Sequence, residues 1–326
     1  MDEQNLFANR LDLSQLTESV AQIRSEIHKI IVGQEAMIDM LIVALLADGH
    51  VLIEGVPGVA KTLTAKLLAR TLSIGFSRIQ FTPDLMPSDV LGTSVYNLQQ
   101  SRFEFKRGPV FSNLILIDEI NRAPAKTQSA LFEVMEERQA TVDGTTYPMA
   151  APFFVLATQN PIEQEGTYRL PEAQLDRFLL KINVPYPDLE QEQQVLQEFH
   201  DRKNINDLKR IRPVLQEAQI NALKALVRQI HIEENLLAYI ARLVHHTRNH
   251  SALYLGGSPR ASLAILTCAQ AHAAINGRDF VTPEDIQAVL YPVLRHRLLL
   301  TPEKEMEGAT TDAVIQQIIE KIEVPR

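Results

Sequence analysis

Short apolar runs and stretches of helical spacing alternate along the first half of the chain. The runs predict strands of a parallel sheet, at residues 50–54, 77–81, 113–118, 153–157 and 181–184. Apolar residues at helical spacing predict helices, at residues 12–30, 35–47, 63–70, 83–91, 125–138 and 171–181. This alternation is typical of an α/β fold with helices on both faces of the sheet.

Two further segments predict β-hairpins inserted into this pattern. Residues 95–106 alternate apolar and polar side chains on either side of a Gln-Gln-Ser turn. Residues 140–149 carry an Asp143-Gly144 turn, which favours a two-residue hairpin connection.

The pattern changes after Pro187. Residues 188–326 contain helical spacing and no convincing strand, with predicted helices near 220–230, 236–244, 258–277, 282 onward and 310–322. We therefore expect an α/β domain over residues 1–187 and an all-α domain over residues 188–326.

The turn after the first predicted strand has the composition of a phosphate-binding loop. Residues 55–62 read Gly-Val-Pro-Gly-Val-Ala-Lys-Thr and precede a helix. Such a turn points backbone N–H groups inward, and the helix N-terminus adds partial positive charge. We expect Lys61 to reach the outer phosphates of a nucleotide and the Thr62 hydroxyl to ligate Mg²⁺. The remaining expected nucleotide contacts are Gly55, Pro57, Gly58, Val59, Ala60 and Leu63.

Two positions near this loop depend on backbone conformation. Ala60 stands where the motif has glycine, and it would be strained if the position required a positive φ. A break at Val32-Gly33 separates two predicted helices, and its apolar side chain and backbone groups could surround an adenine. Glycine also ends many helices, so this second prediction has a simple structural alternative.

A pair of carboxylates ends the strand predicted at residues 113–118. The carboxyl ends of parallel strands form the ligand-binding edge of an open α/β sheet. Asp118 is the candidate for holding Mg²⁺ through water, and Glu119 the candidate for polarising an attacking water. The alternative is a solvated acidic pair.

Three more polar residues are candidates for the same chemistry. Asn160 follows the neighbouring strand and could orient water, or it could simply form a turn before a proline. Arg177 could reach a phosphate in a neighbouring subunit, or pair with Asp176 or Glu172 at the surface. Arg260 lies in the first turn of a predicted helix, where its positive charge is unfavourable beside the positive end of the helix dipole. This misfit suggests that Arg260 meets a phosphate, and an arginine on the helix surface is the alternative.

Composition narrows the class of protein. The chain has 326 residues, is 45% hydrophobic and 22% charged, and carries a net charge of −8, which argues against a general nucleic-acid-binding surface. Its single cysteine, Cys268, cannot form an internal disulfide. The acidic N-terminus does not resemble a signal peptide, and no apolar run approaches the roughly 20 residues that span a bilayer. We expect a cytoplasmic protein.

Five ordered motifs together carry a resemblance to a known family. The chain resembles the AAA+ ATPases, more closely their MoxR branch, in residues 55–62, 116–124, 157–161, 170–178 and 256–261. Ala60 is the variant that this branch tends to carry. The resemblance implies the following roles: Lys61 and Thr62 as Walker A, Asp118 and Glu119 as Walker B, Asn160 as sensor 1, Arg177 as arginine finger and Arg260 as sensor 2. Whether Arg260 would act within or across subunits stays open.

The resemblance also implies cofactors and partners. Members of the branch use ATP and Mg²⁺, are usually hexameric rings, and are thought to remodel partner proteins, often ones with von Willebrand A domains, or to aid metal-cofactor insertion or complex maturation. The alternatives are a nucleic-acid motor and a nucleotide-gated scaffold with little turnover. The predicted hairpin tips, residues 99–102 and 143–146, contain one basic residue between them, which favours protein over nucleic acid.

Overall fold

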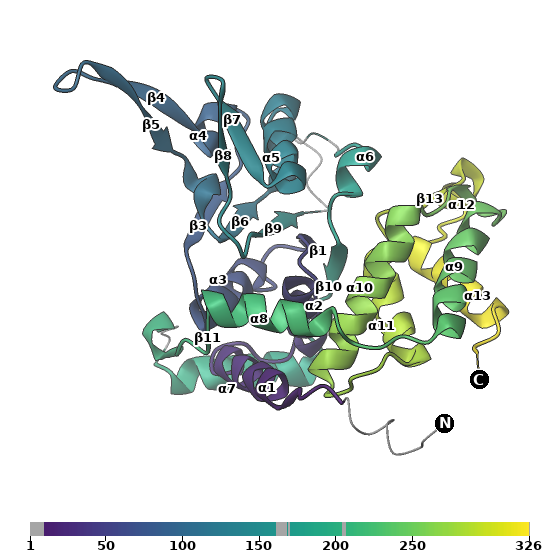
Figure 1. Ribbon diagram of the computed structural model, residues 1–326. Helices are drawn as coiled ribbons and strands as arrows, with labels where there is room; N and C mark the ends of the chain where they lie inside the picture. Colours follow the sequence, from purple (N-terminus) through teal and green to yellow (C-terminus); the bar gives the residue numbers. More distant parts are fainter. Residues whose placement is uncertain (1–9, 161–167, 169, 204–206, 326) are drawn as a thin grey trace.

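A five-stranded parallel sheet forms the centre of the molecule (Figure 1). The computed structural model describes residues 10–160, 168, 170–203 and 207–325. The strands lie in the order β10-β1-β9-β6-β3, with bounds β1 Val51–Gly55, β3 Phe76–Gln80, β6 Leu114–Asp118, β9 Phe154–Gln159 and β10 Leu180–Val184. All four strand pairs are parallel. The α/β class and the five predicted strands are therefore confirmed, with shifts of one or two residues at the strand ends.

Helices cover both faces of the sheet, and the strand residues divide between them. One face packs against α1 Ser14–His28, α2 Glu35–Leu46 and α3 Lys61–Thr71, and the other against α4 Pro87–Leu91 and α5 Ala125–Glu137. In β1, Val51 and Ile53 join the first cluster and Leu52 joins the second. This alternation explains why the strand sequences are apolar throughout. The short elements between them are β2 Leu72–Ser73 and the 3₁₀ turns Pro109–Phe111 and Ile120–Arg122.

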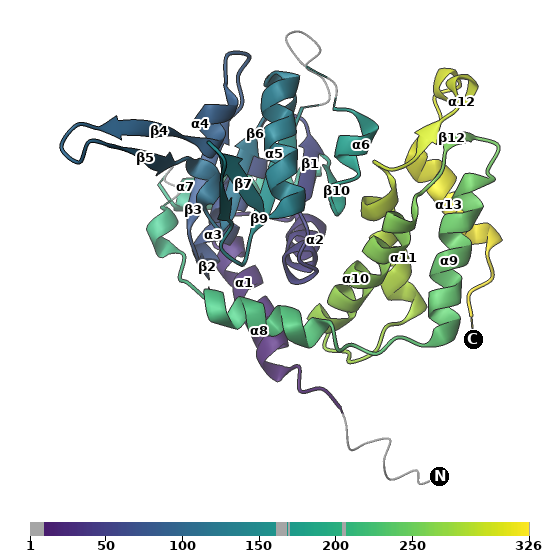
Figure 2. The same cartoon turned by 45° about the horizontal axis from the view of Figure 1, so that its top comes forward.

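Both predicted hairpins are present, and they contact each other. β4 Gly92–Asn97 pairs with β5 Arg102–Arg107, and this hairpin projects from the body of the molecule (Figure 2). β7 Gln139–Val142 pairs with β8 Thr145–Pro148 through a turn in which Asp143 and Gly144 both have positive φ. The rings of Phe105 and Tyr147 stack at 4.4 Å and join the two hairpins.

The second half of the chain is mainly helical. Its helices are α7 Leu189–Asp201, α8 Glu217–Val227, α9 Glu234–Arg248, α10 Pro259–Ile275, α11 Pro283–Leu294, α12 Pro302–Met306 and α13 Thr311–Lys321, with a 3₁₀ turn at Leu208–Arg210. The predicted helical character is confirmed, but short strands also occur among the described residues of this half. β11 Leu215–Gln216 pairs with β2, and β12 Leu253–Leu255 pairs with β13 Leu299–Leu300. Strands of two or three residues are too short to produce a detectable alternation.

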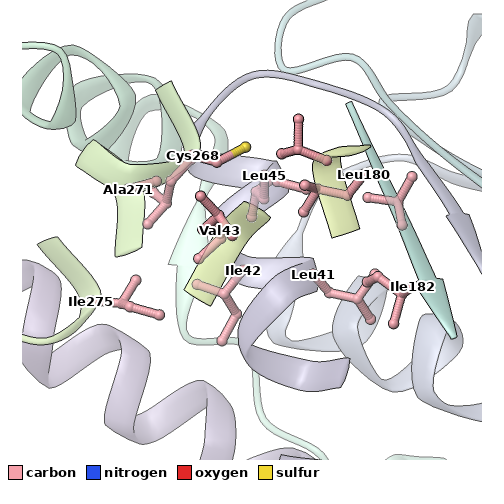
Figure 3. Close-up of a cluster of buried hydrophobic side chains, with 14 of the residues drawn as sticks. Leu41, Ile42, Val43, Leu45, Leu180, Ile182, Cys268, Ala271 and Ile275 are labelled. Carbon is pink, nitrogen blue, oxygen red and sulfur yellow. The ribbon is translucent and has the colours of Figure 1, made fainter. Parts of the chain in front are cut away.

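The helical half packs directly on the α/β half. Figure 3 shows apolar side chains of α2, including Leu41 and Ile42, between Leu180 and Ile182 of β10 and residues of α10. The cluster includes Cys268, whose burial raises the pKa of the thiol to about 12. This cluster contains residues from both sides of residue 187. The domain boundary expected at residue 187 stays a prediction.

One predicted helix is much shorter in the structure. The helix expected over residues 171–181 is α6 Glu172–Leu175, and residues 176–179 leave the helical path. Carbonyl oxygens of residues 176, 178 and 179 accept hydrogen bonds from side chains that follow α11. The helix expected over residues 83–91 likewise begins only at Pro87. Within the described residues, no helix is long and apolar enough to cross a membrane.

Candidate functional site

The glycine-rich turn connects β1 to α3 and has two residues in the left-handed backbone region. Gly58 has φ +90°, and an added Cβ there would meet nothing within 4 Å. Ala60 has φ +59° and lies immediately before α3. The position therefore requires the conformation that glycine adopts without strain, and alanine bears a cost on the order of 1 kcal/mol. This conformation brings the N-terminus of α3 to the carboxyl ends of β1 and β9.

Lys61, the first residue of α3, points across these strand ends. Its ammonium group donates to the carbonyl oxygen of Gly55 and, at 3.4 Å, to that of Gln159. Lys61 is thus oriented by β1 and β9 at the position where a phosphate group would meet the loop.

Thr62 and Asp118 face each other, as their sequence motifs predict. The Thr62 hydroxyl donates to Asp118 Oδ1 at 2.9 Å, and Asp118 is only 4% exposed. Arg78 Nε donates to Asp118 Oδ2 at 2.7 Å, and the Thr158 hydroxyl donates to Oδ1 at 3.3 Å. Hydroxyl and carboxylate oxygens of this kind suit a hard divalent cation such as Mg²⁺.

Glu119 is more exposed than Asp118 and is held by different partners. Its Oε2 accepts from Gln80 Nε2 at 2.9 Å and lies 3.2 Å from Arg122 Nε. Its backbone N–H donates to the Thr158 hydroxyl at 3.1 Å, and its φ is +57°. Two donors therefore fix the carboxylate at the edge of the sheet, beside the Thr62–Asp118 pair.

Arg78 and Gln80 are site residues that the sequence analysis missed. Both lie in β3, and Gln80 stands in register with Asp118. Their only sequence signal is a polar residue on each side of Ile79. That signal becomes informative once β3 is known to pair with β6, and strand order is not readable from one sequence.

A cavity of about 860 Å³ adjoins the loop. It is lined by Val32, Gly58, Val59, Ala60 and Leu63 among the predicted contacts, by Tyr186, Gln191 and Val195 around α7, and by Ala288, Tyr291, Pro292 and Arg295 of the second half. Gly33 lies between two lining residues, and a Cβ added there would meet the Gln191 side chain at 3.0 Å. Gln34, which the sequence analysis did not select, donates to the Val59 carbonyl oxygen at 2.8 Å and so joins the break after α1 to the loop.

The remaining candidates lie in two places. Asn160 directly follows β9 and is buried, at 8% exposure, at the same sheet edge as Asp118. Arg177 and Arg260 meet elsewhere, on the carboxylate of Glu136 in α5. Arg177 contacts Glu136 Oε2 at 2.9 Å, and Arg260 contacts Oε1 at 3.0 Å and Asp176 at 3.8 Å. The structure thus groups the two arginines with each other, beside a different set of residues from those lining the cavity.

The arrangement is suited to binding a polyanion together with a divalent cation. The loop and the α3 N-terminus supply donors and positive charge, and Thr62 and Asp118 supply oxygen ligands. No group of three or more His, Cys, Asp or Glu side chains that could hold a metal occurs among the described residues. A cation held by Thr62 and Asp118 would complete its shell with water and with oxygens of the bound anion, as Mg²⁺ does in nucleotide sites.

Comparison with known proteins gives consistent matches over most of the chain. Residues 50–180 match the family model described as "ATPase family associated with various cellular activities (AAA)", and residues 245–318 match an AAA lid domain. Chaperone MoxR1 of Mycobacterium tuberculosis is 44% identical over 92% of this chain and 81% of its own. YeaC of Bacillus subtilis, whose name states no function, is 45% identical over 92% of both chains. A solved structure of a candidate ATPase from Cytophaga hutchinsonii superposes with a TM-score of 0.87, at 44% identity, over 95% of this chain and 96% of that one.

Proposed function

The chain belongs to the MoxR family of AAA+ ATPases, and from this premise we propose that it hydrolyses ATP with Mg²⁺ as a ring whose subunits share active sites, with partner proteins as substrates. The observation that carries the proposal is the Thr62–Asp118 contact of 2.9 Å beside Glu119, at the edge of a cavity formed with the glycine-rich loop. A cation-binding pair, a candidate base and a nucleotide-sized cavity meet there.

In this proposal the adenosine occupies the cavity and the phosphates extend over the loop. Backbone N–H groups of residues 55–62 and the Lys61 ammonium hold the phosphates, and Val32 and Gly33 lie against the adenine side. Thr62 and Asp118 hold Mg²⁺, which neutralises phosphate charge when bound. Arg78, which donates to Asp118 at 2.7 Å, keeps that carboxylate oriented.

Glu119 acts as the group that polarises the attacking water. Gln80 and Arg122 orient its carboxylate, so it enters the reaction without a large rearrangement. Asn160, buried at the end of β9, orients the water from the adjacent strand. A positioned carboxylate of this kind contributes about 10² to 10⁴ in rate.

Arg177 and Arg260 complete the site of a neighbouring subunit. Both contact Glu136 within their own subunit, and the helical half reaches its own cavity with other residues, including Arg295. This grouping supports action across the subunit interface for both arginines, the direction that the sequence left open for Arg260. This requirement fits a homo-oligomeric ring built on a head-to-tail interface, hexameric in this proposal.

The projecting hairpin supports a protein partner over a nucleic acid. Its most exposed large side chains are Tyr96, Leu98 and Phe103, with exposed fractions of 47%, 83% and 72%. Arg102, at its tip, is paired with Glu104 at 3.2 Å. Apolar and aromatic surface of this kind suits contacts with polypeptide. This surface supports remodelling of partner proteins, and we extend the proposal to partners with von Willebrand A domains on the family resemblance, and to the cytoplasm as the sequence led us to expect.

The test separates nucleotide binding from hydrolysis. Glu119→Gln should retain ATP affinity within about threefold and lower kcat at least about 100-fold, because the amide cannot act as the base. Lys61→Ala should instead weaken ATP binding. Fluorescent-nucleotide titration and steady-state phosphate release measure the two quantities. Wild-type turnover by Glu119→Gln would contradict the role proposed for Glu119.

A further inference from the structure

Arg297 is a buried cation that the proposed chemistry does not use. It follows α11 by three residues, and its side chain is only 4% exposed. An arginine so deeply buried needs a full set of acceptors, because an unpaired buried charge is costly. The positions of these acceptors show which part of the chain Arg297 holds in place.

The partners of Arg297 lie mainly in one short segment, residues 176–179. Its Nε donates to Asp176 Oδ1 at 2.7 Å. Its Nη groups donate to the carbonyl oxygens of Phe178 at 2.7 Å, Leu179 at 3.1 Å and Asp176 at 3.3 Å. His296 Nε2 donates to the Phe178 carbonyl oxygen as well, at 2.9 Å.

This segment includes Arg177. Arg297 therefore contacts the residue before Arg177 and the two residues after it. Phe178 is fully buried, and its ring packs edge-on against the ring of Phe132 with centroids 5.7 Å apart, which anchors the segment to α5. Arg177 itself extends to the Phe132 carbonyl oxygen at 2.6 Å and to Glu136. The backbone on either side of Arg177 is thus oriented by a residue from the helical half.

The helix that precedes Arg297 also lines the nucleotide cavity of the same subunit. Ala288, Tyr291 and Pro292 of α11, and Arg295 just after it, face that cavity. Arg295 additionally donates to the Lys181 carbonyl oxygen at 3.4 Å. Figure 1 shows α11 beside β10, which continues from the segment that carries Arg177. α11 therefore contacts the cavity through residues 288–292, and the residues just beyond its end contact the segment that carries Arg177.

We propose that Arg297 is a positioning residue for Arg177, through which α11 transmits occupancy of a subunit's own cavity to the arginine that the subunit presents to its neighbour. A nucleotide in the cavity contacts α11, and a shift of α11 moves Arg297 together with residues 176–179. The inference rests on the proposed role of Arg177 in a shared site.

The test uses Arg297→Met and its conservative counterpart Arg297→Lys. Arg297→Met should lower kcat about 10- to 100-fold, the range for a misplaced catalytic group, and leave the KM for ATP within about threefold. Arg297→Lys should recover part of the loss, since it retains the charge but not the planar set of donors. Arg278→Met is the matched control, because Arg278 pairs with buried Asp285 within the helical half. It should change thermal stability and leave kcat within about twofold.

Mixed assemblies give the readout that a general loss of stability would not produce. Arg297→Met subunits keep an intact nucleotide site, and Glu119→Gln subunits keep an intact Arg177. Mixing the two in equal amounts should therefore raise turnover per Arg297→Met subunit to about half the wild-type rate, about 5- to 50-fold, because half of these sites receive a well-placed arginine. Glu119→Gln subunits that also carry Arg177→Ala should give no rescue.

The same experiment distinguishes the two proposals. Arg177→Ala mixed with Glu119→Gln tests the shared site alone, and absence of rescue there would overturn the proposed function. Rescue of Arg177→Ala without rescue of Arg297→Met would overturn the inference about Arg297, as would wild-type kcat for Arg297→Met alone. If thermal unfolding shows that Arg297→Met does not fold, Asp176→Asn, which removes the charged partner, takes its place and should show the same loss and the same rescue.

Discussion

Asp48 joins the helical half to the sheet, and replacing it should destabilise the protein by a predictable amount. Asp48 lies in the turn between α2 and β1. Its Oδ1 accepts from Lys224 of α8 at 2.6 Å, and its Oδ2 lies 3.1 Å from an Arg138 guanidinium nitrogen. Burial alone would raise the pKa of Asp48, but Lys224 and Arg138 outweigh it and hold that pKa below its usual value. The carboxylate is therefore charged at neutral pH.

The substitution Asp48→Asn removes this charge and little else. Asp48 has φ +61°, a conformation that asparagine adopts readily, so the backbone should not change. Lys224, which is 5% exposed, would be left as a buried ammonium without its carboxylate. Breaking a buried pair in this way costs about 3–5 kcal/mol. Because asparagine keeps one acceptor oxygen, we expect the lower end, about 3 kcal/mol of unfolding free energy.

Thermal and denaturant unfolding measure this loss. For a chain of 326 residues the unfolding entropy is roughly 0.7 kcal/mol/K, so about 3 kcal/mol corresponds to a Tm lower by about 4 °C. The double variant Asp48→Asn with Lys224→Met removes both members of the pair and should recover about 1–2 kcal/mol. A loss below about 1 kcal/mol in the single variant, or a double variant no more stable than the single, would refute the reasoning.

Two further predictions concern buried or strained groups. His50 is fully buried and its pKa is lowered from 6.5 to about 4, chiefly by burial; its contribution to stability should therefore be complete above pH 6.5 and be lost as the pH falls toward 4. That loss is about 3 kcal/mol, measured by denaturant unfolding across this range, and His50→Gln should flatten the pH dependence; equal slopes in both proteins would contradict it. Ala60→Gly should keep the unfolding free energy within about 1 kcal/mol and preserve ATP affinity, because relief of the left-handed strain offsets the greater freedom of glycine in the unfolded chain. Ala60→Val should weaken ATP binding, and equal nucleotide titrations for the two variants would show that the conformation at this position does not matter.

Local sequence determined much of the fold because the main elements have strong, regular patterns. The strands at residues 113–118 and 153–157 are apolar on both faces, and the turn at Asp143-Gly144 has a conformation that few other residue pairs adopt. The sequence predicts that Thr62 and Asp118 lie close together, because both belong to motifs that hold the same Mg²⁺ ion, and they are in contact in the structure. These predictions depend on periodicity or on a motif, and both are contained in a single sequence.

The rest depends on contacts between segments that are distant in the chain. α6 ends at Leu175, and the backbone N–H groups of Leu179 and Leu180, which would extend it, donate instead to the carbonyl oxygen of His50, far earlier in the chain. Gln80 reaches Glu119 because β3 pairs with β6, and the strand order is set by the whole sheet. Arg177 and Arg260 meet on Glu136 only because the helical half packs beside α5, and this packing is also not readable from local sequence.

The central claim is that active sites are shared between subunits. ATP turnover per subunit, measured with Mg²⁺ over a wide range of protein concentration for wild type and Arg177→Ala, tests it most directly. Wild-type turnover should rise with concentration as subunits assemble, and Arg177→Ala should stay at least about 100-fold lower at every concentration. A wild-type rate per subunit that is high and independent of concentration, or Arg177→Ala turnover equal to wild type, would contradict it.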